Sequence, residues 1–140
     1  MNTRVIGSFR PSKYRKEVIF RELGVALWAA GWEPVYNDYL GDYSKVGGYN
    51  DVRMPAATRT IANVLGWHHD GGVDQYGGFF VVWSNCYPTQ ARTCTGEVLI
   101  PRPYDLFLID NREVEHRIDP RSEHTKRRWF ARQVVKERDT

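Results

Sequence analysis

Short apolar or β-branched runs, divided by turn residues, dominate the chain from about residue 58 onward. Gly-Gly, Tyr-Pro and Asp-Pro pairs separate these runs, and no helical period links them. The runs occupy residues 60–67, 79–84, 96–100, 105–110, 114–118 and 127–135. Several short strands joined by turn signals are typical of a β-sandwich or a barrel. The sequence therefore predicts a mainly β fold.

A helix is predicted before this region. After Pro11, Ser12 is placed to cap a helix that continues to about Ala30, and Gly31 tolerates the left-handed conformation that ends helices. Apolar residues recur at three- and four-residue spacing at Ile19, Leu23, Ala26, Leu27 and Ala30. Residues 3–8 are expected to be extended. One apolar helix face packed on a β-sheet gives an α+β domain.

The length of 140 residues predicts a single compact domain over residues 1–140, which buries roughly two-thirds of its unfolded surface. No apolar stretch approaches the roughly 18 residues of a membrane span, and the start lacks an apolar signal region. We therefore expect a cytoplasmic protein. In a reducing compartment Cys86 and Cys94 are expected to be free thiols. The polar segment between them is expected to be an exposed hairpin. The alternative is that its Thr89, Gln90 and Arg92 border a functional site.

Two other regions stand out by composition. Residues 36–58 interleave tyrosines with glycines, and a loop of this length predicts a lid or substrate loop. Residues 10–16 and 126–138 are basic, but a net charge of +3 is too mild to indicate a nucleic-acid binder. Such runs are usually solvated faces, and nucleic acid stays an alternative partner.

Two histidines and an aspartate are candidate metal ligands. His68 and Asp70 are two positions apart at the end of a predicted strand, so their side chains project to the same side. His116 is near the start of a later strand. His69 should point the opposite way, and His124 is expected at the surface. Two imidazoles and one carboxylate form the facial triad that holds non-haem Fe(II) and leaves coordination positions open.

Five segments, in this order, carry a family resemblance. They are Trp67-His68-His69-Asp70-Gly71, residues 79–85, residues 101–108, residues 111–117 and residues 127–130. With them the chain resembles the Fe(II)- and 2-oxoglutarate-dependent dioxygenases over residues 60–135, about half of its length. Residues 101–108 are similar to the family's turn of proline, glycine, aspartate and an apolar residue, with Tyr104 where glycine is common.

This resemblance implies a double-stranded β-helix, or jelly roll, with the N-terminal helix packed on a sheet. It implies that His68, Asp70 and His116 hold Fe(II). Arg127 would bind the distal carboxylate of the cosubstrate 2-oxoglutarate, with Arg128 as the alternate. Asn85 and Trp83 would line the cofactor pocket, although sheet packing is the simpler role for Trp83. The implied reaction consumes 2-oxoglutarate and O₂ and releases succinate and CO₂ as an unidentified substrate is hydroxylated.

Three other interpretations of the same residues are open. A cupin-like metal protein has the same fold, but its usual glutamate a few positions after the histidines is missing here, where Asp74 and Gln75 follow. A non-catalytic domain could use the tyrosine-rich loop and an aromatic cleft to bind a sugar or a peptide. An oxygenase acting on nucleic acid would use the two basic segments and would bind in a salt-sensitive manner.

Overall fold

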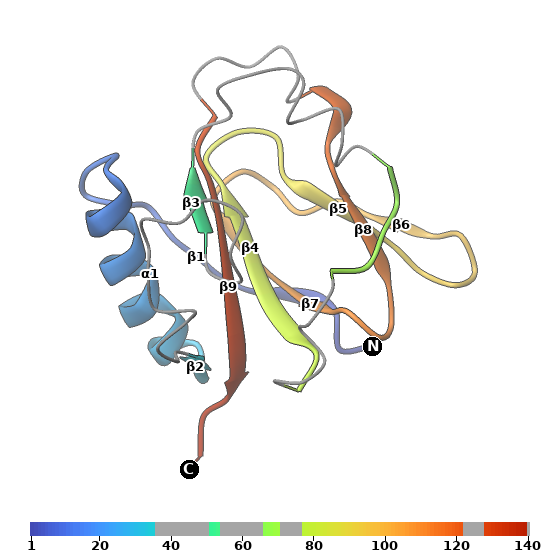
Figure 1. The fold of residues 1–140 in the computed structure, drawn as a ribbon, viewed down its shortest axis with the longest axis horizontal. Coiled ribbons are helices and arrows are strands. Elements are labelled where there is room, and N and C mark those ends of the chain that lie inside the picture. The colour runs from blue at the N-terminus through green and yellow to red at the C-terminus, as the bar shows by residue number, and fades with distance from the viewer. Residues whose placement is uncertain (36–50, 54–65, 71–76, 122–127, 140) are drawn as a thin grey trace.

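The computed structural model describes residues 1–35, 51–53, 66–70, 77–121 and 128–139. Within these ranges the chain forms one helix and nine strands (Figure 1). In chain order they are β1 (Arg4–Ser8), α1 (Lys16–Ala29), β2 (Trp32–Pro34), β3 (Asp51–Arg53), β4 (Phe79–Ser84), β5 (Thr89–Arg92), β6 (Val98–Leu99), β7 (Asp105–Asp110), β8 (Glu115–Ile118) and β9 (Phe130–Glu137). The predicted mainly β fold with a leading helix is confirmed.

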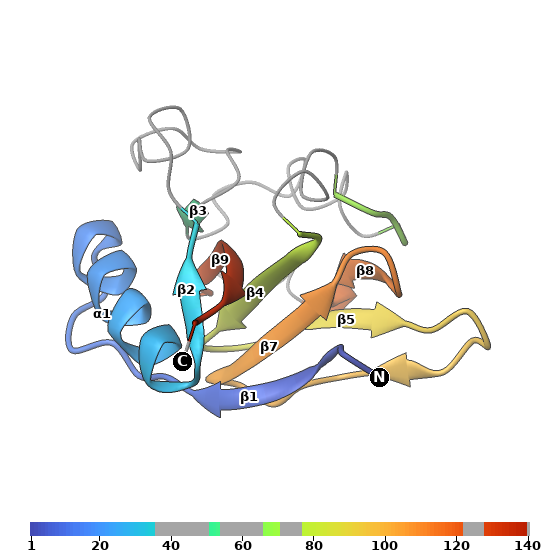
Figure 2. The same cartoon turned by 90° about the horizontal axis from the view of Figure 1, so that it is seen from below.

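The strands form two antiparallel sheets. The larger has the order β1-β7-β4-β9-β2, with β3 also paired to β9, and the smaller has the order β6-β5-β8. Both sheets curl, and the larger lies between α1 and the smaller (Figures 1 and 2). The result is a half-barrel with a helix on its outer side.

Helix α1 packs on the outer face of the larger sheet. Its buried residues fall on one side, whereas Val25 is 70% exposed and Trp28 is 50% exposed. The outer cluster joins residues of α1 to residues of β4, β7 and β9: Ile19, Phe20, Leu23, Leu27, Val81, Trp83, Leu106, Leu108, Ala131 and Val135. Trp83 also donates its indole N–H to the carbonyl oxygen of Phe9 at 2.8 Å. Sheet packing is therefore the observed role of Trp83.

The predicted helix start is wrong by one turn. The helix begins after Arg15, which has an extended backbone and makes no side-chain cap. Ser12 instead donates its backbone N–H and its hydroxyl to the two carboxylate oxygens of Glu22, both at 2.6 Å. The competing carboxylate lies ten residues away and could not be located from local cap signals. The predicted stop is confirmed, because Gly31 has a φ of +92°.

A second apolar cluster fills the interior of the half-barrel. Successive strand residues face opposite sides of a sheet, so the neighbours of the outer cluster face inward. This interior cluster contains Phe80, Val82, Ala91, Phe107, Ile109, Val114, Phe130 and Val134. It joins the larger sheet to β5 of the smaller sheet and lies beneath the candidate site.

The segment between the two cysteines is not an exposed polar hairpin. Residues 89–92 form β5, which pairs with both β6 and β8. Thr89 and Gln90 are buried, and Ala91 belongs to the interior cluster. The strand lacks bulky apolar residues because its inward positions are occupied by small ones, so it carried no strand signal. Cys86 and Cys94 are free thiols, as expected.

Tyr104 has a φ of +71°, the one positive value among the described non-glycine residues. Glycine adopts such a conformation without strain, because it has no Cβ. Here Tyr104 is held on both sides by hydrogen bonds: its N–H donates to the Ser84 carbonyl at 2.8 Å, and its carbonyl accepts from Phe9 at 2.9 Å. The glycine-like turn is thus formed with a tyrosine.

Several sequence predictions fall outside the described ranges. They are the apolar run before residue 66, His124, Arg127 and the lid over residues 36–58, of which only β3 is described. In the part of the chain that is described, no helix is long and apolar enough to span a bilayer.

Candidate metal centre

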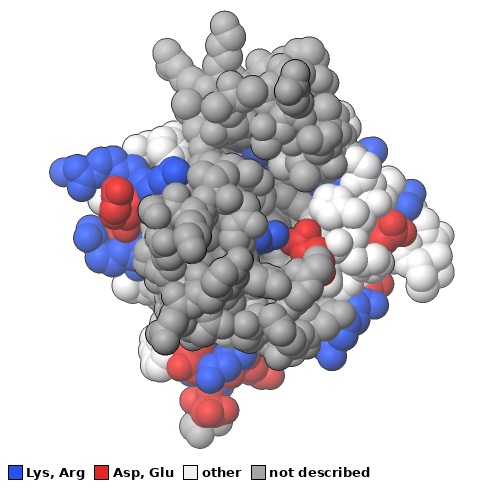
Figure 3. Space-filling model, in the orientation of Figure 1, with Lys and Arg blue, Asp and Glu red and all other residues white. Residues whose placement is uncertain are grey.

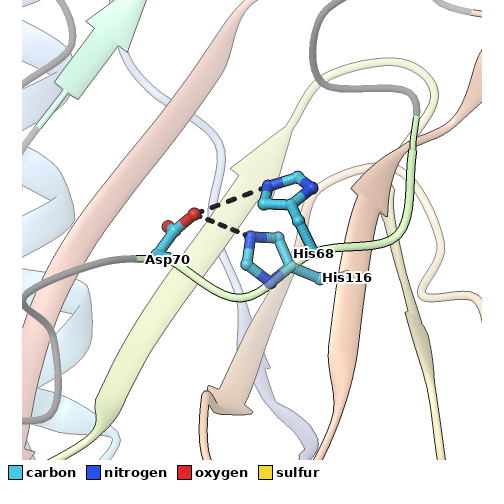
Figure 4. A group of neighbouring side chains, drawn as sticks. All are labelled: His68, Asp70 and His116. Atoms are coloured by element: carbon cyan, nitrogen blue, oxygen red, sulfur yellow. Dashed lines mark hydrogen bonds and ion pairs between the residues drawn. The ribbon is translucent and has the colours of Figure 1, made fainter.

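Two backbone hydrogen bonds bring the candidate ligands together. His68 donates its N–H to the carbonyl of His116 at 3.0 Å, and His116 donates to the carbonyl of His68 at 2.9 Å. This antiparallel bridge sets residues 66–70 beside β8, and the two imidazole centroids are 4.3 Å apart. Asp70, two residues after His68, projects to the same side (Figure 4). The three residues chosen from the sequence therefore meet at one point.

The spacing of the ligand atoms suits a single ion. Asp70 Oδ1 lies 3.1 Å from His116 Nε2 and 3.5 Å from His68 Nε2, and all three ligand atoms lie within 4.8 Å of one another. With ligand bonds of about 2.1 Å, neighbouring positions of an octahedral site are about 3 Å apart. The two pairs of ligand atoms that include Asp70 Oδ1 already approach this separation. A small movement of His68 would bring the remaining pair, the two imidazole nitrogens, to the same spacing.

Hydrogen bonding prepares His68 to bind through Nε2. Its Nδ1 lies 2.7 Å from the carbonyl oxygen of Gly66, which can only accept, so Nδ1 carries the proton. Nε2 then faces Asp70 with its lone pair available in the neutral ring. In the protonated ring Nε2–H donates to Asp70, and this hydrogen bond raises the pKa of His68 against the opposing effect of partial burial. A bound ion would compete with a proton for this nitrogen.

His116 is the deepest of the three ligands. Its side chain is 7% exposed and packs against the Phe80 ring in a T-shaped arrangement at a centroid distance of 5.0 Å. Burial lowers the pKa of His116, although the hydrogen bond to Asp70 acts in the opposite direction. The ring is therefore neutral at pH 7, as a metal ligand must be. Its Nδ1 is buried and has no hydrogen-bond partner in the described structure.

Asp70 contacts both histidines of the site and Arg132. Burial by itself would raise the pKa of Asp70, but hydrogen bonds with His116 and His68 and the charge of Arg132 outweigh it. The pKa of this carboxyl is consequently held well below its usual range. Arg132 Nη1 of β9 donates to Asp70 Oδ2 at 2.6 Å, a distance typical of a strong charge-assisted hydrogen bond. Asp70 is therefore fully ionised at neutral pH.

Asn111 fixes the backbone on either side of the Asp70 carboxylate. Its Oδ1 accepts from the Asp70 N–H and its Nδ2 donates to the Asp70 carbonyl, both at 2.9 Å. The Asn111 carbonyl in turn accepts a hydrogen bond from Nδ1 of His69 at 2.6 Å. His69 thus makes its contact apart from the triad, as its position on the strand predicted.

Trp67 anchors the ligand segment to the outer face of the smaller sheet. The guanidinium carbons of Arg92 and Arg117 lie 4.7 Å and 4.4 Å from the centre of its ring. Arg117 also donates Nε to Gln90 at 3.0 Å, which ties β8 to β5 at this point. These cation–π contacts and the backbone bridge together hold residues 66–70 beside β8.

The arginines expected to bind 2-oxoglutarate lie just before β9. Arg128 is fully buried, its Nε donates to the Tyr87 carbonyl at 3.1 Å, and its guanidinium lies 5.0 Å from the Phe130 ring centre. Phe130 belongs to the interior cluster, so Arg128, two residues earlier, is on the inward side of the chain. Arg127 lies outside the described residues. Its proposed role therefore stays a prediction.

Asn85 lies at the end of β4 and joins two segments of the larger sheet. Its Oδ1 accepts a hydrogen bond from the backbone N–H of Trp129 at 2.7 Å. Asn85 is two residues after Trp83, which packs toward α1, so strand alternation places the two on the same face of the sheet. Val82, on the opposite face, belongs to the interior cluster. The contact shown here is structural, and a cofactor-binding role for Asn85 stays a prediction.

Two site residues were missed in the sequence. Arg132 and Asn111 contact Asp70 from 62 and 41 residues away, which no local spacing reveals. Thr89, which the sequence offered as a residue that could border the site, is buried in the smaller sheet, and its hydroxyl has no hydrogen-bond partner among the described residues. A signal was available for Arg132, because alternation along the predicted last strand places it with Arg128 on one face.

A site of two histidines and one carboxylate, on a curled β scaffold, defines the chain as a candidate mononuclear metal protein. Comparisons of the chain with models of known protein families, with curated proteins and with solved structures found no match. The geometry of the chain itself is therefore what bears on its function.

Proposed function

We propose that this protein is an Fe(II)- and 2-oxoglutarate-dependent dioxygenase that hydroxylates a substrate yet to be identified. The observation that carries the proposal is the meeting of His68, Asp70 and His116, with Asp70 Oδ1 3.1 Å and 3.5 Å from the two imidazole nitrogens. This donor set leaves about half of an octahedral coordination sphere for other ligands, which is the arrangement typical of non-haem Fe(II) oxygenases.

The order of the strands supports a double-stranded β-helix as the finer description of the fold. From residue 66 onward, the strand segments belong alternately to the two layers, except that β5 and β6 follow each other in the smaller one. Residues 66–70 lie beside β8 in the smaller layer, while β3, β9, β4 and β7 are neighbours in the larger. Two antiparallel layers wound together in this manner are what a jelly roll requires.

The interior also offers groups suited to a dicarboxylate cosubstrate. Arg128 presents a buried planar guanidinium, which can donate two parallel hydrogen bonds to a carboxylate. Thr89 and Ala91 both point inward from β5, so the Thr89 hydroxyl faces the same interior as Phe130. This hydroxyl has no hydrogen-bond partner within the described ranges. A ligand oxygen would satisfy this buried hydroxyl, which otherwise costs about 1–3 kcal/mol. These donors fit 2-oxoglutarate.

The division of labour among residues follows from their surroundings. His68, Asp70 and His116 would hold the ion, and Arg128 would orient the distal carboxylate, with Arg127 as the other candidate. When bound, Fe(II) and 2-oxoglutarate supply the reduction of O₂, with release of succinate and CO₂ and insertion of one oxygen atom into a substrate C–H bond. The apolar interior around Phe80 would exclude bulk water from the buried side of the centre.

An anaerobic titration of the metal-free protein with Fe(II) and 2-oxoglutarate tests the proposal. We expect a saturable visible charge-transfer band in the wild-type protein, loss of the band in His68→Ala, and retention in His69→Ala. The last variant is a matched control, because His69 is an adjacent imidazole that bonds to Asn111 instead of Asp70. Arg128→Ala should raise the 2-oxoglutarate concentration required, and Arg127→Ala should leave it unchanged.

Each alternative outcome assigns a different function. Fe(II) binding without the band, and without succinate formation in air, would favour a cupin-like or non-catalytic metal protein. Failure to bind Fe(II) would overturn the metal centre and favour a binding domain. An effect confined to Arg127→Ala would move the carboxylate site to that residue.

Nucleic acid as the substrate has weaker support on the described surface. Several arginines there are paired with carboxylates: Arg92 with Glu115, Arg112 with Asp110, and Arg121 with Asp119. On the face shown in Figure 3, visible basic and acidic side chains are interspersed. A single extended basic field, which phosphate backbones would favour, is not seen among the described residues of that face.

A further inference from the structure

The two oxygens of Asp70 have different partners. Oδ1 faces the Nε2 atoms of His116 and His68, where an ion would bind. Oδ2 accepts the 2.6 Å hydrogen bond from Arg132, the shortest contact that the carboxylate makes among the described side chains. A carboxylate can bind a metal ion through one oxygen or through both. In this protein one of the two is already occupied by a guanidinium.

Arg132 is held firmly enough to maintain this arrangement. It lies within β9, where its backbone is opposite Val82 of β4 on one side and Asp51 of β3 on the other. Its side chain is 19% exposed, so the contact with Asp70 is largely shielded from water. Charge-assisted hydrogen bonds strengthen when they are shielded. Rotation of Oδ2 toward an ion would require this bond to break.

The backbone of Asp70 is fixed independently. Asn111 bonds to both its N–H and its carbonyl, so the residue cannot shift as a whole to release Oδ2. Only rotation of the carboxylate remains, and Arg132 opposes that rotation.

We infer that Arg132 is a positioning residue that restricts Asp70 to one-oxygen coordination and so keeps one further coordination position of the ion open. The inference rests on the proposed metal centre and deepens it. An open position matters there because the cosubstrate and O₂ must both reach the ion. A carboxylate bound through both oxygens would occupy a position that they need.

Counting the water molecules on bound Mn(II) tests this role with the metal alone. Broadening of the Mn(II) electron paramagnetic resonance lines by ¹⁷O-enriched water reports the number of bound waters. We expect Arg132→Met to have one bound water fewer than the wild-type protein, because Asp70 can then bind through both oxygens. Arg132→Lys, which keeps a cationic donor, should retain the wild-type number.

Arg102→Met is the control. Arg102 is also an arginine paired with a carboxylate, that of Asp105 at 3.9 Å, but it does not contact Asp70 or the segment that carries the ligands. It should leave the water count unchanged. If circular dichroism shows that Arg132→Met does not fold, Arg132→Ala is used in its place, because it removes the same donor.

The possible results separate the two hypotheses. An unchanged water count in a folded Arg132→Met or Arg132→Ala protein that binds Mn(II) would overturn the positioning role and leave the metal centre intact. Absence of Mn(II) binding to the wild-type protein would overturn the centre itself, and the inference about Arg132 with it.

Discussion

Asn111 shows how a residue that cannot bind the ion can still determine whether the ion binds. It is 3% exposed, and its side-chain amide spans the backbone N–H and carbonyl of Asp70. Partners of this kind orient ligands before the ion arrives, and their loss typically reduces metal affinity by roughly 10–100-fold.

We therefore expect Asn111→Ala to weaken Mn(II) or Fe(II) binding by roughly 10-fold or more. Equilibrium metal titration measures the effect. Asn111→Asp keeps an acceptor for the Asp70 N–H but loses the donor to its carbonyl, so its affinity should be intermediate. Wild-type affinity in Asn111→Ala would show that the backbone of Asp70 is fixed without this side chain.

The residues of the site differ in how far the sequence reveals them. His68 and Asp70 are recognisable because two-residue spacing on a strand is a local property. His116 was proposed from its position near the start of a later predicted strand and from the family resemblance, but its place beside His68 depends on a bridge between distant segments. The pairing of Arg132 with Asp70 depends on the assembled sheets, since the partners are 62 residues apart. Local patterns thus predicted the ligands but not what orients them.

At the level of elements, α1 stabilises the larger sheet through one face only. Leu27 is fully buried in the outer cluster, while Val25, two residues earlier, is 70% exposed. Leu27→Ala should lower the free energy of unfolding by about 2–5 kcal/mol, because it removes buried methyl groups and leaves a cavity. Val25→Ala should change it by less than about 0.5 kcal/mol.

Urea denaturation of the two variants measures this difference. Similar losses in both would mean that α1 does not dock on the sheet as described. Metal affinity provides a second readout, because the helix lies on the opposite side of the sheet from the triad. A folded Leu27→Ala protein should retain it.

Element prediction succeeded where side chains were large and failed where they were small or where a distant partner intervened. The strands β4 and β7 are nearly continuous apolar runs and were located to the residue. Strand β5 was not predicted, because its inward residues, Thr89 and Ala91, are small. The helix start was misplaced because Glu22 bonds to Ser12, the expected cap.

For the whole molecule, the triad joins the two sheets at one point. His116 belongs to the smaller sheet, and Asp70 is bonded to Arg132 of the larger. In the metal-free protein the two histidines make the stability of the fold depend on pH in opposite directions. The raised pKa of His68 stabilises the fold below the ordinary histidine value of 6.5, and this contribution is lost as the pH rises through the folded pKa. The lowered pKa of His116 makes the fold lose stability as the pH falls below 6.5.

A bound ion should stabilise the whole molecule and do so in a pH-dependent manner. At an ion concentration 100 times the dissociation constant, binding adds about 2.7 kcal/mol of stability, which corresponds to a rise in Tm of roughly 10 °C for a chain of this size. The ion requires neutral imidazoles, and the raised pKa of His68 lets protons compete above the ordinary histidine range. The rise in Tm should therefore be complete above the folded pKa of His68 and shrink as the pH falls through it.

Thermal unfolding with and without Mn(II), measured across this pH range, tests the coupling. His68→Ala should show little rise in Tm at any pH, whereas His69→Ala should follow the wild-type curve, because His69 bonds to Asn111 and not to Asp70. A rise in Tm that is the same at every pH would mean that His68 does not bind the ion through a nitrogen that protons also occupy. The ion would then be held elsewhere, and the link between the two sheets would not pass through the triad.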